Sequence, residues 1–342
     1  MNRTEPWPQI DTLRATLTRM DGEGTPAGQL AELVALGLDH LPLPGSGATL
    51  ARWQALAAVA RHDLSLAKLY EGHTDALAVL QELAAGDAAP DDAIWGTWAA
   101  EPPGQRVLID IDGDGRVALR GHKPWCSGAA SVSHGLLTAW LADGSGPQLV
   151  AVSMRQGGIE VSAQHWCAVG MADSASLDVR FDKAPARLIG KPGDYLQRPG
   201  FWQGGAGIAA CWYGGTLTLA EALHQAVAAR PEPFRLAALG RIDVGLRATA
   251  ALLRETAIWI DVHPTEDAST VTLRARQSAE STARLVLDEV GRALGATPFC
   301  RDARFARAAA DLPVYIRQSH AERDFAALGE RLTQRKESPW TL

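Results

Sequence analysis

The spacing of apolar residues changes twice along the chain and predicts three regions. Up to about residue 94 the apolar residues recur at helical intervals, which predicts helices over 30–38, 50–60 and 64–83. From about 94 to 193 apolar and polar residues alternate, as is typical of half-buried strands. Gly113-Asp-Gly115 joins two of these segments and predicts a hairpin. The strands are expected at 107–112, 116–120, 148–154, 159–162 and 177–182.

Helical spacing returns after Pro199-Gly200. Four amphipathic helices separated by short proline-containing loops predict an antiparallel four-helix bundle. These helices are expected at about 208–226, 242–260, 271–294 and 302–332. The predicted fold class is therefore α+β multidomain: an N-terminal helical domain over 1–94, a middle antiparallel β-barrel or sandwich over 95–195, and a C-terminal bundle over 196–342.

Composition and charge exclude several classes of protein. The 342 residues exceed what one hydrophobic core usually supports. A net charge of -6 and interspersed arginines argue against a nucleic-acid-binding face, which needs clustered basic residues. No membrane span or signal peptide is recognisable, so a cytoplasmic location is expected. The cysteines have no metal-ligand spacing, so we expect buried free thiols and no metal site. They are Cys126, Cys167, Cys211 and Cys300.

An indole and a hydroxyl stand two residues apart in the segment Gly121-His-Lys-Pro-Trp-Cys-Ser-Gly128. On an extended strand, the Trp125 indole can cover one face of a flat redox-active ring while the Ser127 hydroxyl or N–H reaches its edge. Trp125 can also be a core aromatic, because the chain holds eleven tryptophans. Lys123 and Ser127 beside it favour contact with a flavin.

Six motifs, in order and spacing, resemble the acyl-CoA dehydrogenase family. Ala60–His73 resembles its amino-terminal segment with an Asp-x-Ser and a Gly-His pair, and Trp98-Ala-Ala-Glu-Pro-Pro-Gly104 is similar to its flavin loop. Lys123-Pro-Trp-Cys-Ser127 resembles its Lys-x-Trp-Ile-Thr strand. The other three segments resemble its Gly-Met crossing, its Val-x-Phe-Asp strand and its Phe-Gly-Gly…Arg-Asp region. They are Trp166–Ser174, Val179–Ala186, and Leu294–Phe299 with Arg307 and Asp311.

This resemblance implies a flavoprotein that oxidises an acyl thioester, such as an acyl-CoA, in fatty acid metabolism. The implied cofactor is FAD, with Trp125 against the ring and Ser127 near N5, the atom that receives hydride. Glu101 and Gly104 of the flavin loop are further cofactor candidates, although Ala99 stands where the family has Thr.

The resemblance also implies an oligomer, because the adenosine half of FAD docks in a neighbouring subunit of this family. The segments that correspond to its docking elements begin at Arg230 and at Gly295, and both depart from the family pattern. A homodimer or homotetramer is expected, with an electron-transfer flavoprotein or a flavin reductase as a partner.

The glutamate that serves as the family's base is missing at both of its usual positions. The first position, eight residues after Asp311, is Ser319, and the second is Gly204. Three hypotheses follow. His320, or Glu322 as second choice, replaces the base, since an imidazole is a competent general base. Alternatively, the chain resembles the family's flavin monooxygenase branch, in which reduced flavin reacts with oxygen and His320 assists proton movement. In the third, the fold is a non-catalytic binding protein. His320 can also lie on a solvated helix face.

Overall fold

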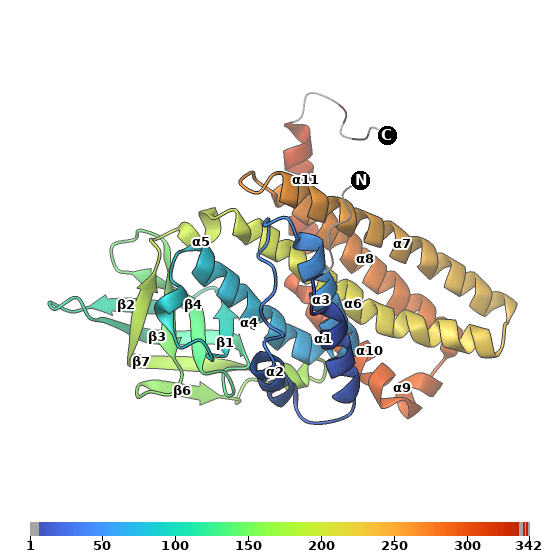
Figure 1. Ribbon diagram of the computed structural model, residues 1–342, viewed down its shortest axis with the longest axis horizontal. Coiled ribbons are helices and arrows are strands. Elements are labelled where there is room, and N and C mark those ends of the chain that lie inside the picture. Colours follow the sequence, from blue (N-terminus) through green and yellow to red (C-terminus); the bar gives the residue numbers. More distant parts are fainter. Residues whose placement is uncertain (1–6, 335–337, 339, 341–342) are drawn as a thin grey trace. The chain divides into compact units, whose positions relative to one another are not determined.

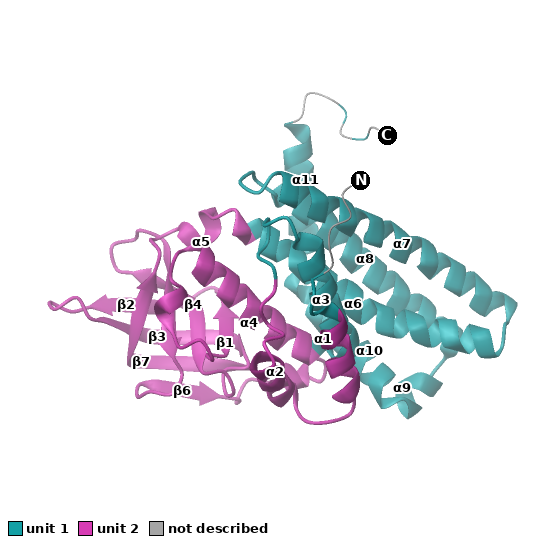
Figure 2. Cartoon of the chain, in the orientation of Figure 1, with its two compact units in different colours: residues 1–10, 42–64, 202–342 teal, residues 11–41, 65–201 magenta. Residues whose placement is uncertain are grey.

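A computed structural model describes residues 7–334, 338 and 340 of the chain. Its residues form two compact units, coloured separately in Figure 2. The first, here called the barrel unit, comprises 11–41 and 65–201, and the second, the bundle unit, comprises 1–10, 42–64 and 202–342. This division follows contacts and groups N-terminal helices with both units. The three-domain division with boundaries near residues 94 and 195 stays a prediction.

The barrel unit contains three of the N-terminal helices and all seven strands (Figure 1). The helices are α1 (Ile10–Arg19), α2 (Pro26–Ala35) and α4 (Leu64–Glu82). The strands are β1 (Trp95–Trp98), β2 (Val107–Ile111), β3 (Val117–Ser127), β4 (His134–Leu141), β5 (Pro147–Ser153), β6 (Ile159–Ser162) and β7 (Ser176–Ile189). Short helical pieces complete the unit at η1 (Gly86–Ala88), η2 (Ala172–Ser174) and α5 (Asp194–Gln197). The predicted strands and the hairpin between β2 and β3 are confirmed.

The strands close into a small barrel. Pairing runs from β4 through β2, β3, β7 and β5 and returns to β4, with β1 and β6 attached to β4 and β7. This closure decides between the predicted barrel and sandwich. The expectation of a purely antiparallel sheet is wrong, because β4 pairs in parallel with both β1 and β2. Two parallel strands need a crossover connection, and for β1 and β4 this connection contains the hairpin of β2 and β3.

The inside of the barrel is apolar and fixes the direction of the alternating side chains. Leu119 of β3, Val150 of β5 and Val179 of β7 have no solvent exposure. Because successive side chains of a strand point to opposite faces, the residues between these apolar positions face outward. The register of β3 against β7 therefore decides which polar side chains share the outer face.

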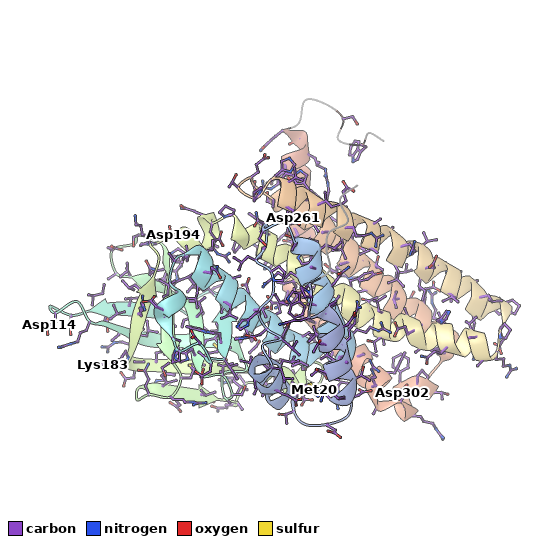
Figure 3. All side chains as sticks on the ribbon, in the orientation of Figure 1. Met20, Asp114, Lys183, Asp194, Asp261 and Asp302 are labelled. Carbon is purple, nitrogen blue, oxygen red and sulfur yellow. The ribbon has the colours of Figure 1, made fainter. Side chains whose placement is uncertain are left out.

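The bundle unit contains three of the four predicted bundle helices as long, unbroken helices. They are α6 (Gly200–Ala229), α7 (Pro233–Val262) and α8 (Ser269–Leu294). The N-terminal helix α3 (Thr49–His62) belongs to the same unit. Asp261 at the end of α7, labelled in Figure 3, accepts a hydrogen bond from the Thr49 hydroxyl at 2.6 Å. Gly214 lets α6 approach α3 closely, since a Cβ there would lie 2.3 Å from the Ala57 carbonyl oxygen.

The predicted continuous helix over 302–332 is wrong, because the chain breaks there. After the short helix α9 (Thr297–Arg301), the chain forms α10 (Ala303–Tyr315), η3 (Ile316–Gln318) and α11 (Glu322–Thr333). The predicted start is confirmed, since Asp302 caps α10 by accepting from the Phe305 N–H at 3.0 Å. The Ser319 Oγ accepts from the Ala321 N–H at 3.1 Å, and Ala321 has a φ of 46°. These side-chain bonds to the backbone compete with helical pairing and end the helix.

Candidate functional site

A β-bulge in β3 presents Trp125 to the outside of the barrel. The register of β3 on β7 shifts between Lys123 and Cys126, and Trp125 in this bulge has a φ of 58°. Its neighbours Pro124 and Cys126 are buried, whereas the indole is 57% exposed. The alternative that Trp125 is a core aromatic is therefore wrong. A bulge re-aims a side chain, and a non-glycine residue at positive φ is strained, so such a position suggests a function for the exposed ring.

Three serine hydroxyls form a continuous chain beside Trp125. The Ser127 and Ser176 Oγ atoms are 2.7 Å apart, and the Ser176 and Ser174 Oγ atoms are 3.0 Å apart. The Ser174 hydroxyl is buried and donates to the Met171 carbonyl at 2.8 Å. The backbone at Ser127 is also held, because the Trp98 indole N–H donates to its carbonyl at 3.1 Å. Ser127 thus has a fixed position, and its side chain keeps partial access to solvent.

A buried cation of the same strand is bound by a carboxylate of the predicted flavin loop. Lys123 has no solvent exposure, and its Nζ lies 3.2 Å from the Glu101 Oε1. Glu101 also accepts from the Thr138 hydroxyl at 2.6 Å and from the Trp140 indole at 2.8 Å. Three internal donors therefore occupy the Glu101 carboxylate, which makes it a structural partner of Lys123. A direct role for Glu101 in cofactor binding stays a prediction.

The charges of this pair are shaped by burial and by its hydrogen bonds. Burial alone would raise the pKa of Glu101, but the bonds from Thr138, Lys123 and Trp140 outweigh it and hold the pKa below its ordinary value. Burial lowers the pKa of Lys123, and the Glu101 carboxylate partly opposes that change. Glu101 is accordingly ionised at neutral pH.

Gly104 lies in a turn of the same loop with a φ of 80°, a conformation that favours glycine. Nothing lies within 4 Å of where its Cβ would be. This open backbone is compatible with the predicted contact to a cofactor, which stays a prediction.

In the bundle unit, the break between η3 and α11 places the two candidate bases in exposed positions. The His320 side chain is 64% exposed, and its Nδ1 lies 3.5 Å from the Asp324 Oδ1. The Asp324 Oδ2 accepts from the His320 N–H at 3.1 Å and so fixes this turn. Glu322 begins α11 and is exposed. His320 thus lies in a turn and not on a helix face.

The position of the first missing glutamate is occupied by a buried serine. The Ser319 Oγ accepts from the Gln277 side-chain amide at 3.0 Å, so it is part of the packing of α8. A buried carboxylate nearby on α8, Glu280, is tied by Arg284 and Arg317, each at 2.6 Å. Burial would raise the pKa of Glu280, but its hydrogen bonds, including those from the two guanidinium groups, lower it. A carboxylate held ionised in this way is a poor proton acceptor for an α-carbon.

The predicted adenosine-docking residues lie at the ends of long helices of the bundle unit. Arg230 follows α6, is 80% exposed and pairs with Glu232 at 3.1 Å. Gly295 ends α8 with a φ of 63°, and nothing lies within 4 Å of where its Cβ would be. Their role in cofactor binding stays a prediction, as do Trp125 and Ser127 as flavin contacts.

The cysteine prediction is partly confirmed. All four cysteines are free, but only Cys126 and Cys211 are buried, while Cys167 and Cys300 are exposed. Within residues 7–334, 338 and 340, no cluster of His, Cys, Asp or Glu is arranged to hold a metal ion. In the same part of the chain, every helix is too short or too polar to cross a membrane.

Two members of the hydroxyl chain and the partner of Lys123 are not evident from the sequence. Ser174 and Ser176 stand two residues apart in Asp-Ser-Ala-Ser, which is a weak signal without knowledge of the register against Ser127. Glu101 lies 22 residues before Lys123, and no local pattern indicates their pairing.

Comparison with known proteins shows the fold. No protein-family model and no curated protein matches the chain. The structure is similar to that of TdsC, a dibenzothiophene monooxygenase from Paenibacillus sp. A11-2, solved with FMN and indole, with 20% identity, 97% of each chain covered and a TM-score of 0.77. It is also similar to the methanesulfinate monooxygenase MsuC from Pseudomonas fluorescens, with 18% identity, 98% of this chain and 99% of that chain covered, and a TM-score of 0.80.

A third similar structure is KijD3 in complex with FMN and dTDP-3-amino-2,3,6-trideoxy-4-keto-3-methyl-D-glucose. It is 20% identical, with 97% of this chain and 93% of that chain covered and a TM-score of 0.78. The shared arrangement therefore extends over nearly the whole chain, both its barrel and its helices.

Proposed function

We propose that the chain is a flavin-dependent monooxygenase on the acyl-CoA dehydrogenase-like fold. It uses reduced flavin supplied by a separate reductase, and molecular oxygen, to oxidise an organic acceptor. The observation that carries this proposal is the lack of a carboxylate at both positions of the family's base, on a fold shared with TdsC and MsuC over nearly its whole length. The similarity to these monooxygenases favours monooxygenation over dehydrogenation of an acyl thioester.

The chemistry of the residues supports this choice. Dehydrogenation requires a base that removes an α-proton, and such a carboxylate needs a pKa raised toward neutral. Ser319 cannot serve, Gly204 has no side chain, and Glu280 is already paired with two arginines. A monooxygenase that receives its flavin already reduced needs no such carboxylate.

We propose FMN as the flavin, in place of FAD. FMN is the flavin bound by TdsC and by KijD3. The segments expected to dock an adenosine half also argue for the shorter cofactor. Arg230 is exposed and pairs with Glu232, and Pro298 stands in the segment that begins at Gly295. FAD remains the alternative, and equal affinity for the two flavins would support it.

The residues that would hold the ring have the chemistry that it requires. Trp125 offers an exposed flat face, and Ser127 offers a fixed hydroxyl two residues further along β3. Bound flavin supplies the electrons that activate oxygen. His320, which is fixed by Asp324, is proposed to take up or deliver a proton at its imidazole. We also propose a homodimer or homotetramer that works in the cytoplasm with a flavin reductase as its partner.

A reductase-coupled assay tests the proposal. Purified protein is combined with FMN, a flavin reductase and NADH, and consumption of aromatic and organosulfur acceptors is followed together with oxygen uptake. We expect acceptor oxidation that requires both the protein and the reductase. Oxidation of an acyl-CoA in the absence of reductase would restore the dehydrogenase hypothesis, and failure to bind either FMN or FAD would support a non-catalytic role.

A further inference from the structure

We propose that the serine chain in the barrel makes Ser127 a hydrogen-bond acceptor, so that this strand binds reduced flavin in preference to oxidised flavin. The inference rests on the proposed function, because it concerns the same flavin site. It adds a selectivity for one redox state, set by Ser174 and Ser176, which do not themselves have to touch the ring.

The direction of the chain follows from counting protons. A serine hydroxyl has one proton to donate, whereas a carbonyl oxygen only accepts. The Ser174 hydroxyl gives its proton to the Met171 carbonyl at 2.8 Å. Its bond to Ser176, at 3.0 Å between the two Oγ atoms, then requires Ser176 to be the donor. The bond between Ser176 and Ser127, at 2.7 Å, in turn requires Ser127 to donate.

The end of this chain is therefore polarised. The single proton of Ser127 points to Ser176, and only lone pairs of its Oγ remain for a bound molecule. The Ser174 side chain is buried, with 1% of the residue exposed, so water does not compete for its proton, and the Met171 carbonyl accepts both from this hydroxyl and from the Ser174 N–H at 3.1 Å. The Trp98 indole N–H donates to the Ser127 carbonyl at 3.1 Å and so fixes the backbone that carries this hydroxyl.

An acceptor at this position distinguishes the two redox states of a flavin. The N5 atom of oxidised isoalloxazine has a lone pair and no hydrogen, whereas N5 of the reduced ring carries a hydrogen. Ser127 would donate a hydrogen bond to neither form. Its Oγ would accept a hydrogen bond from the reduced N5–H, whereas its lone pair would repel the lone pair of oxidised N5. Preference for the reduced form suits a protein that receives reduced flavin from another enzyme and releases it oxidised.

The test compares flavin affinities and not turnover. Dissociation constants of oxidised FMN and of anaerobically reduced FMN are measured by calorimetry for the wild type and for Ser174→Ala. Without the Ser174 hydroxyl, Ser176 is free to donate to Ser127, and Ser127 can then donate to N5. Other contacts to the ring can also favour one redox state, so the informative quantity is the change in the ratio of the two constants.

A matched control is Ser131→Ala, because the Ser131 hydroxyl donates to the Gly128 carbonyl at 2.9 Å and is not part of the chain. Should the buried Ser174→Ala substitution impair folding, Ser176→Ala breaks the same chain at a partly exposed position. Circular dichroism establishes folding before affinities are compared.

We expect the wild type to bind reduced FMN about tenfold more tightly than oxidised FMN, which is the factor that one net hydrogen bond provides. Ser174→Ala and Ser176→Ala should lower this ratio severalfold, and Ser131→Ala should leave it unchanged. An unchanged ratio in both chain variants, with both flavin forms still bound, would overturn the inference alone. No binding of either form by the wild type would overturn the flavin site itself, and the inference with it.

Discussion

The buried pair of Lys123 and Glu101 predicts an asymmetry between two substitutions that remove the same salt bridge. Lys123→Met removes the buried cation, whereas Glu101→Gln leaves that cation in place without its counter-charge. In the native protein the ammonium group donates to the Thr138 carbonyl at 2.9 Å, the Thr138 hydroxyl at 2.8 Å and the Glu101 carboxylate at 3.2 Å. Glu101→Gln should therefore be the more damaging change.

The magnitudes follow from burial. Removing one partner of a buried ion pair typically costs about 3–5 kcal/mol. Because the Glu101 side chain is 20% exposed and water can reach it, we expect the lower end, about 3 kcal/mol, for Glu101→Gln. After Lys123→Met, Glu101 keeps its bonds from Thr138 and Trp140, and the Thr138 hydroxyl keeps its bond to Glu101. The main loss is the ammonium donor to the Thr138 carbonyl, so the cost should be about 1 kcal/mol.

Urea unfolding of the single and double variants at neutral pH measures these free energies. In the double-mutant cycle the coupling should be about 3 kcal/mol, because Glu101→Gln becomes nearly harmless once the cation is gone. The difference between the wild type and Glu101→Gln should shrink in acid. The lowered pKa of Glu101 stabilises the folded state above the ordinary value of 4.5, and this stabilisation is lost as the pH falls through the folded-state pKa. A cost of Lys123→Met equal to or above that of Glu101→Gln would refute this account of the pair.

Three further predictions concern the exposed site residues and the thiols. Trp125→Gly should relieve the strain of the positive φ, raise the free energy of unfolding by about 1 kcal/mol and weaken FMN binding. Trp125→Ala should weaken FMN binding and keep the strain. Unchanged FMN affinity in both variants would exclude the indole from the site. His320→Ala should lower the rate of acceptor oxidation about hundredfold, whereas the rate of Glu322→Gln should stay within about twofold of that of the wild type. The reverse ranking would show that Glu322, and not His320, transfers the proton. A thiol reagent on the native protein should label Cys167 and Cys300 and spare Cys126 and Cys211, and mass spectrometry of the labelled peptides would expose any other pattern.

Local periodicity predicts much of the fold because burial of one face imposes it directly. The helices α3 and α4, five of the seven strands and the three long bundle helices follow from apolar spacing, whereas the strands β1 and β4 are not predicted by it. The break before α11 does not, because it depends on bonds that Ser319 and Asp324 make to the backbone of their own turn. The parallel pairing of β1 with β4 is likewise decided by tertiary closure and not by local sequence.

The candidate site shows the same limit. The motif from Lys123 to Ser127 identifies the strand, but an alternating pattern contains no sign of the bulge that exposes Trp125. The motif also cannot indicate that Glu101 balances Lys123, or that Ser176 lies opposite Ser127, since both contacts depend on strand register. Exposure of Cys167 was missed because isolated cysteines are commonly buried and its loop has no periodicity.

The source of the electrons distinguishes the two oxidoreductase hypotheses most directly. The visible absorbance of the FMN-loaded protein is followed without oxygen during addition of a series of acyl-CoAs, and then during addition of a flavin reductase with NADH. We predict that every thioester leaves the flavin oxidised and that the reductase with NADH bleaches it. Bleaching by a thioester alone would contradict the monooxygenase proposal and show that the chain dehydrogenates acyl groups despite Ser319 and Gly204.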